Sequence, residues 1–256
     1  MMRTVKVKNI EIGAGVPKIA VPIIGRDLPD LRREIAILKR VPADLVEWRA
    51  DFLDAAGEES EVMDTASAIR RLLPDLPILF TFRTAKEGGN RQVGSDRYAA
   101  LNKRMIGSGL IDLVDVELNS GDTVVRELVE TAHRSGVAVI LSNHEFQRTP
   151  SEETMIRRLC AMQERGADIS KIAVMPQTSA DVLKLLKVTN LMKTTFADRP
   201  FITVSMSGKG AISRLTGELF GSALTFGSAE TASAPGQIGA GKLAEWLAFV
   251  HDQLTE

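Results

Sequence analysis

The sequence lacks the features that mark several classes of protein. Its 256 residues contain one cysteine, Cys160, so no internal disulfide can form, and a single thiol suits a reducing compartment. Lysine and arginine (32) almost balance aspartate and glutamate (33), so no basic excess is available for the phosphates of a nucleic acid. The longest apolar stretches, such as 137–141, are far shorter than the roughly 20 residues of a membrane-spanning helix, and no apolar signal core is visible. We therefore predict a cytoplasmic protein that binds neither nucleic acid nor membranes.

A short apolar run, a polar loop and an amphipathic helix recur along the chain. The apolar runs do not alternate with polar residues, which is typical of parallel strands buried on both faces. Glycine or proline follows several of the amphipathic segments and predicts where those helices end. The predicted strands are 18–22, 44–49, 78–82, 113–117, 138–143, 169–175, 201–204 and 223–226, and the predicted helices include 27–40, 123–135, 151–165 and 179–192.

Eight such units predict an α/β fold, a (β/α)8 TIM barrel, in a single domain of residues 1–256. A doubly wound open sheet would need a glycine-rich phosphate turn after the first strand, but residues 21–26 contain no GxGxxG. Segment 6–16 alternates polar and apolar residues ahead of the repeat. We predict that it forms a β-hairpin, turning at 13–15, that closes the barrel floor.

Two residues near predicted strand ends could carry chemistry, because active sites of parallel barrels lie at the C-terminal ends of the strands. His144 ends the fifth strand, and histidine exchanges protons near neutral pH; a histidine that only caps the loop is the alternative. Lys171 lies inside the sixth strand, where a buried amine must be paired, neutralised or used, for example to form a Schiff base with a carbonyl compound. If the strand starts later, Lys171 is instead exposed on the barrel floor.

Other charged residues at strand ends allow several roles. Glu47 and Arg49 share one strand face and could pair with each other or bind hydroxyl groups. Arg83 and Arg214 suit a substrate carboxylate, because arginine binds carboxylates bidentately. Glu47 and Glu117 could instead hold Mg²⁺, but Arg49 disfavours this, and no HExxH, CxxC or close histidine pair predicts a metal site.

Seven segments stand in one order along the chain. They are Glu47-Trp48-Arg49, Phe80-Thr81-Phe82-Arg83-Thr84-Ala85-Lys86-Glu87-Gly88-Gly89, Ser142-Asn143-His144, Lys171-Ile172-Ala173-Val174-Met175-Pro176, Ser205-Met206-Ser207, Ile212-Ser213-Arg214 and Ser233-Ala234-Pro235-Gly236-Gln237. Together they resemble the type I 3-dehydroquinate dehydratase family, and the resemblance runs from residue 18 to residue 238. Two positions depart from the family pattern, namely Pro22 and the glycine-rich Gly208-Lys209-Gly210.

The resemblance implies a lyase of the shikimate pathway that dehydrates 3-dehydroquinate to 3-dehydroshikimate, without a metal or an organic cofactor. It implies that Lys171 forms an imine with the substrate ketone, that His144 transfers the protons, and that Glu87 orients His144. It also implies a homodimer. The residues that it implies for substrate binding are Glu47, Arg49, Arg83, Met206, Arg214, Ser233 and Gln237.

Two other functions compete with this reading, and one loop adds a further expectation. A class I aldolase would share Lys171, but it usually needs a phosphate site near the last two strands that these loops do not clearly supply. A non-catalytic barrel that binds a polyhydroxy acid would have no need of Lys171 and His144 together.

Residues 228–239 are rich in alanine, serine and glycine, which predicts a mobile lid over the barrel mouth.

Overall fold

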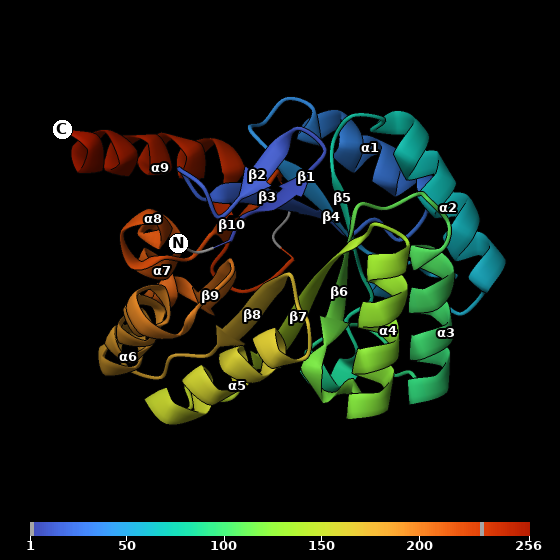
Figure 1. The fold of residues 1–256 in the computed structure, drawn as a ribbon. Coiled ribbons are helices and arrows are strands. Elements are labelled where there is room, and N and C mark those ends of the chain that lie inside the picture. The colour runs from blue at the N-terminus through green and yellow to red at the C-terminus, as the bar shows by residue number, and fades with distance from the viewer. Residues whose placement is uncertain (1–2, 231–232) are drawn as a thin grey trace.

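Parallel strands form a barrel in the computed structural model, which describes residues 3–230 and 233–256 (Figure 1). The ladder runs without interruption from β10 through β3 to β9, and the short strand β11 (Ile238–Gly239) pairs with β10. Between β9 and β10, Ala223 N donates to Phe201 O at 2.9 Å and closes the circle. The barrel strands are β3 (Lys18–Ile23), β4 (Leu45–Arg49), β5 (Ile78–Thr81), β6 (Leu113–Glu117), β7 (Ala138–Glu145), β8 (Ile169–Val174), β9 (Phe201–Ser205) and β10 (Leu224–Ser228).

Helices cover the outside of the barrel, and the four that were predicted from the sequence, α1, α4, α5 and α6, lie within about two residues of the expected bounds. The Asp27 side chain accepts a hydrogen bond from Asp30 N at the start of α1, and Ser151 accepts one from Thr154 N at the start of α5. No helix in the described part of the chain is long and apolar enough to span a membrane. The helices are α1 (Leu28–Leu38), α2 (Glu59–Leu72), α3 (Ser95–Ile106), α4 (Asp122–Arg134), α5 (Glu152–Glu164), α6 (Ser179–Leu191), α7 (Ile212–Leu215), α8 (Gly217–Phe220) and α9 (Ala240–Thr255).

An N-terminal hairpin of β1 (Val5–Val7) and β2 (Ile10–Ile12) closes the barrel floor, as predicted. Its apolar side chains pack against the lowest inward-facing residues of the strands, which include Leu45, Leu79 and Ile140. The predicted turn position is wrong. The chain reverses at residues 8–9, where Lys8 adopts a φ of 49°, and residues 13–15 form the connection to β3 instead.

Inward-facing positions become polar above this apolar floor. In β8, Ile169 and Ala173 point into the barrel, whereas Ser170 and Ile172 face the helices. The alternation therefore turns Lys171 inward, and its exposed fraction is only 5%. This placement rules out the alternative in which the strand starts later and leaves Lys171 in solvent.

Candidate active site

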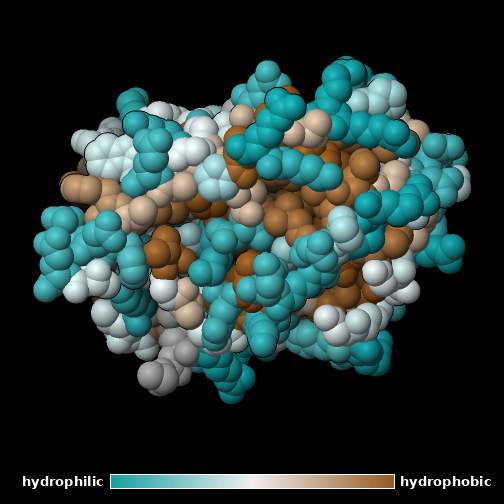
Figure 2. Space-filling model, turned by 90° about the horizontal axis from the view of Figure 1, so that it is seen from above, coloured by the Kyte–Doolittle hydropathy of each residue, from teal (hydrophilic) through white to brown (hydrophobic). Residues whose placement is uncertain are grey.

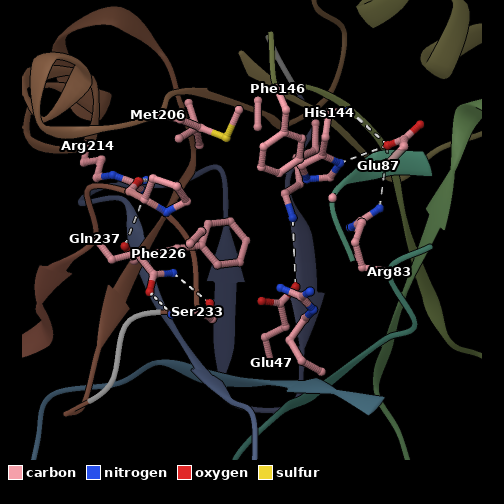
Figure 3. A pocket seen from close by; sticks show the side chains of 17 residues that line it. Glu47, Arg83, Glu87, His144, Phe146, Met206, Arg214, Phe226, Ser233 and Gln237 are labelled. Carbon is pink, nitrogen blue, oxygen red and sulfur yellow. Dashed lines mark hydrogen bonds and ion pairs between the residues drawn. The ribbon is translucent and has the colours of Figure 1, made fainter. Parts of the chain in front are cut away.

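A cavity of about 120 Å³ opens at the C-terminal ends of the strands, and every site residue predicted from the sequence lines it (Figure 3). Apolar side chains complete one wall, with Phe226, Val204 and Met206 on the side of β9 and β10. The predicted residues that meet here come from strands β4, β7 and β8, from the segments that follow β5, β9 and β10, and from helix α7. They are Glu47, Arg49, Arg83, Glu87, His144, Lys171, Met206, Arg214, Ser233 and Gln237.

The Lys171 amine stands at the bottom of this cavity between two carboxylates and an aromatic ring. Its Nζ lies 3.3 Å from Asp115 Oδ2 and 4.0 Å from Glu47 Oε1. The ring of Phe226 faces it, with the centroid 4.3 Å from Nζ. The carboxylates and the ring surround the Lys171 amine, and Lys171 lines the cavity.

Asp115 is a residue of the site that the sequence interpretation missed. It is 1% exposed, and its Oδ1 forms an ion pair with Arg83 Nη2 at 2.8 Å and accepts a hydrogen bond from Ser142 Oγ at 2.5 Å. Burial alone would raise the pKa of Asp115, but the positive charges of Arg83 and Lys171 hold it below its usual range. An aspartate in the middle of the apolar strand 113–117, two residues before Glu117, was the available signal.

Glu87 and His144 form a hydrogen-bonded pair at the rim. Glu87 ends a 3₁₀ turn, Ala85–Glu87, and its Oε2 accepts from His144 N and faces His144 Nδ1, both at 3.0 Å. A carboxylate only accepts, so Nδ1 carries the ring proton and Nε2 keeps a free electron pair. Phe146 stacks on the imidazole with ring centroids 6.4 Å apart. The predicted end of this strand at residue 143 was wrong by two residues, because β7 continues through His144 to Glu145.

Both groups of this pair have shifted pKa values. Burial, together with the positive charges of Arg83 and Lys171, holds the pKa of His144 well below its ordinary value. The imidazole is therefore neutral at neutral pH and able to accept a proton. Burial also raises the pKa of Glu87 to about 7, an effect that the Arg83 guanidinium opposes.

The two predicted carboxylate-binding arginines differ in their partners. Arg83 is ion-paired to Asp115 at 2.8 Å, to Glu117 at 3.1 Å and to Glu87 at 3.8 Å. Arg214 has no carboxylate partner within the described residues. Its Nη atoms donate to main-chain oxygens at 3.3 and 3.4 Å, and its Nε is buried without a hydrogen bond to any described residue. Burial lowers the pKa of Arg214 to about 10. Arg214 is thus the guanidinium that is available for an anionic ligand.

Glu47 and Arg49 point into the cavity but do not pair with each other. Two nitrogens of Arg49 donate to the Asp51 carboxylate, both at 2.9 Å, and Glu47 Oε1 accepts from Thr81 Oγ1 at 2.9 Å. Each therefore has its own support from a neighbouring residue. Of the two roles that the sequence left open, mutual pairing is excluded, and both side chains line the cavity.

Segment 233–237 lies across the mouth of the cavity. Ser233 N donates to Gln237 Oε1 at 2.8 Å, and Gln237 Nε2 donates back to Ser233 Oγ at 3.1 Å. Ser207 N donates to Pro235 O at 3.2 Å and ties the segment to the end of β9. Ser228 and Ile238–Gly239 belong to strands, so the predicted lid is shorter than 228–239, and its residues 231–232 lie outside the described part. Its mobility stays a prediction.

The fold and the cavity define a (β/α)8-barrel enzyme whose reactive side chains gather at the C-terminal ends of the strands. The family model for type I 3-dehydroquinase matches residues 19–253. The chain belongs to this family.

Individual relatives agree with this membership. The chain is 56% identical to the 3-dehydroquinate dehydratase of Syntrophotalea carbinolica over 252 residues. This alignment covers 98% of this chain and 100% of the relative. The crystal structure of the type I enzyme from Clostridium difficile, with covalently modified comenic acid, matches with a TM-score of 0.96 and 51% identity, covering 99% of this chain and 100% of that one. The Enterococcus faecalis enzyme matches with a TM-score of 0.89 and 42% identity, covering 96% and 98%. The 3-hexulose-6-phosphate synthase of Salmonella typhimurium, at 15% identity and a TM-score of 0.59, shares only the fold.

Proposed function

We propose that this chain dehydrates 3-dehydroquinate to 3-dehydroshikimate in the shikimate pathway through a covalent imine on Lys171. The observation that carries the proposal is the buried amine of Lys171, held by Asp115 and Glu47 in the cavity that His144 lines at its rim. Arg214 lines the same cavity without a carboxylate partner among residues 3–230 and 233–256, which supports a substrate that carries a carboxylate.

Imine formation is the first step. The Lys171 nitrogen attacks the ketone carbon, and the resulting carbinolamine loses water to give a protonated imine. Asp115, 3.3 Å from Nζ, is the nearest acceptor for a proton that leaves the amine, and its carboxylate then stabilises the positive iminium. Neutral His144 assists by moving the protons that carbinolamine formation and dehydration require.

Elimination follows on the carbon next to the imine. The iminium draws electrons from the adjacent C–H bond, and His144 Nε2 takes that proton, leaving an enamine. The enamine electrons then expel the hydroxyl group of the next carbon, which leaves as water after receiving the proton from His144. Hydrolysis of the imine consumes the water that imine formation released and regenerates Lys171, so the net change is the loss of one water molecule.

The remaining residues hold the ring in place. Arg214 would bind the substrate carboxylate bidentately, because its buried charge has no carboxylate partner within the described residues. Glu47 and Arg49, each held by a neighbouring residue, would bind hydroxyl groups of the ring. Arg83, which is ion-paired with Asp115, would contact the edge of the substrate ring. Met206, Ser233 and Gln237 would cover the side of the ring that faces the mouth of the cavity.

The direct test is the appearance of the conjugated product. Purified protein mixed with 3-dehydroquinate should produce the ultraviolet absorbance of the new enone, and the rate should scale with protein concentration. A protein that binds 3-dehydroquinate in calorimetry but never produces the absorbance would contradict the proposal and favour a binding barrel.

Activity should fall on the acid side near the pKa of Glu87. Burial raises that pKa to about 7, so below this pH Glu87 takes up a proton and loses the negative charge that strengthens its hydrogen bond with His144 Nδ1. We expect kcat/KM to fall by about tenfold per pH unit below this point, as a single essential carboxylate requires. Glu87→Gln should lower kcat and flatten this acid limb, whereas an unchanged limb in the variant would assign it to another group.

Gly236→Ala should weaken substrate binding by holding segment 233–237 away from the mouth. A Cβ at this position would lie 2.2 Å from Ser207 O, and the φ of 74° is unfavourable for alanine. Strain of this kind typically costs about 1–3 kcal/mol, so we expect KM to rise by about tenfold or more. Gly239→Ala is the matched control, since a Cβ there meets nothing within 4 Å, and wild-type kinetics in both variants would exclude closure of this segment.

Chelators should leave the rate unchanged. The two carboxylates considered for Mg²⁺ already have other partners, since Glu47 accepts from Thr81 and Glu117 binds Arg83 and Thr84. The described residues contain no group of three or more histidine, cysteine, aspartate or glutamate side chains that could hold a metal ion. Loss of activity in EDTA that Mg²⁺ restores would contradict this expectation.

The homodimer and the cytoplasmic location stay predictions. Large apolar side chains are exposed on α8 and α9, with exposed fractions of 47% for Leu219, 44% for Trp246 and 56% for Phe249. Figure 2 shows a face on which hydrophobic patches are bordered by hydrophilic side chains. The exposed apolar side chains of α8 and α9 are compatible with contact to a second copy, and size-exclusion chromatography with light scattering would give the mass in solution.

A further inference from the structure

The Glu87 carboxylate is held from outside the barrel as well as by His144. Asn143 lies between the inward-facing Ser142 and His144 on β7, and its own side chain turns toward the helices, where it is 2% exposed. Its Nδ2 donates to Glu87 Oε1 at 3.3 Å, and its Oδ1 accepts from Arg158 Nη1 at 2.7 Å. A chain of hydrogen bonds therefore runs from α5 through Asn143 to Glu87 and His144.

The chemistry of the two end groups allows only one orientation of the amide between them. A guanidinium can only donate, so the side of Asn143 that faces Arg158 must be the oxygen. A carboxylate can only accept, so the side that faces Glu87 must be the nitrogen. Without the guanidinium, only the Glu87 carboxylate would still favour this orientation, and the Oδ1 side of the amide would lose its hydrogen-bond donor.

We propose that Arg158 is a positioning residue of the active site, which fixes the Asn143 amide so that its N–H holds the Glu87 carboxylate against His144. The proposal rests on the proposed function, because it assigns Arg158 a role in the proton transfers of that reaction. Arg158 itself does not line the cavity, and its side chain is 29% exposed on α5. It also lies 3.5 Å from Glu145 Oε2, which helps to hold the guanidinium in place.

Several other groups also face Glu87. The Arg83 guanidinium is 3.8 Å away and is shared with Asp115 and Glu117, whose charges raise the pKa of Glu87. Asn119 Nδ2 also donates to Oε1, at 3.1 Å, but this asparagine is exposed and has no further hydrogen bond within the described residues. The Asn143 hydrogen bond lowers the pKa of Glu87, so its loss moves protonation of the carboxylate to higher pH.

Arg158→Met tests the proposal, because it keeps the apolar length of the side chain and removes the donor. We expect kcat to fall about fivefold with KM unchanged, as the loss of one hydrogen bond predicts, and the acid limb of kcat/KM to move up by about half a pH unit. Arg158→Lys should restore part of both values, since an ammonium also only donates. The control is Arg157→Met, which alters an exposed neighbour on the same helix that has no hydrogen bond or ion pair within the described residues, and it should behave as the wild type.

A double-mutant cycle separates positioning from a general loss of stability. Asn143→Ala should lower kcat by about tenfold, and adding Arg158→Met to it should cause no further loss, because the arginine acts through this amide. Additive losses, or a fall in Arg158→Met with an unmoved acid limb, would overturn the proposal. Failure of the proposed function would look different, since the wild-type protein itself would then give no enone absorbance.

Discussion

Lys171→Ala is expected to abolish both turnover and covalent trapping of the substrate. Borohydride reduces an imine to a stable amine, so in the wild type it should attach the ligand to the peptide that contains Lys171. The alanine variant has no nitrogen at this position, and the neighbouring Asp115 and Glu47 cannot replace a nucleophilic amine. Mass spectrometry of the digested protein gives the site of attachment directly.

The control for this experiment is a lysine near the mouth. Lys209 donates to Gln177 O and is exposed, and Lys209→Ala should keep both turnover and trapping. An adduct on Lys86 or Lys209 in the wild type would show that the assignment of the nucleophile is wrong. Since Lys171→Ala leaves Asp115 without one of its two cationic partners, a thermal unfolding curve should accompany the measurement.

His144→Ala should lower turnover by at least about 10²–10⁴-fold, the typical contribution of a positioned general acid and base, while still allowing the imine to form. Removal of a carbon-bound proton and expulsion of hydroxide depend on the imidazole more strongly than attack by the amine does. The covalent adduct should therefore accumulate and be visible by mass spectrometry after reduction, although it should form more slowly than in the wild type.

A surface histidine provides the comparison for this variant. His133 pairs with Asp168 at 3.1 Å on the outside of the barrel, and His133→Ala should keep the wild-type rate. Near-normal turnover in His144→Ala would make His144 a structural residue and contradict the mechanism. Glu87→Gln should be milder than His144→Ala, because it changes the orientation and basicity of the imidazole without deleting it.

The barrel was readable from the sequence because its strands are continuous apolar runs. Such runs are typical of parallel strands buried on both faces, and glycines and prolines mark their ends. The predicted ends of strands and turns were wrong where tertiary contacts determine them. β7 runs two residues past its predicted end because Asn143, His144 and Glu145 still pair with β8, and the hairpin turns at 8–9 although residues 13–15 have the stronger turn composition.

The members of the site were easier to predict than their partners. Periodicity places Glu47, Arg49 and Lys171 on the inner face, but it does not say which charges neutralise one another across strands. Arg83 was one of two candidates for binding a substrate carboxylate, but the sequence did not indicate that its guanidinium contacts three carboxylates of the protein. Asp115 was overlooked for the same reason, because its role depends on β5 and β8 lying within reach of β6.

The apolar floor of the barrel gives stability and function separate locations in this molecule. Buried charges at the upper end lower the stability of the folded state. Burial of the hairpin and of the inward-facing leucines and isoleucines at the lower end offsets this loss of stability. A substitution in the floor, such as Ile12→Ala, therefore changes how many molecules are folded at a given temperature, while each folded molecule keeps its catalytic rate. Substitutions that raise the stability of the protein, and so compensate for destabilising changes in the active site or for a higher temperature, are accordingly expected in the floor of the barrel, away from the substrate.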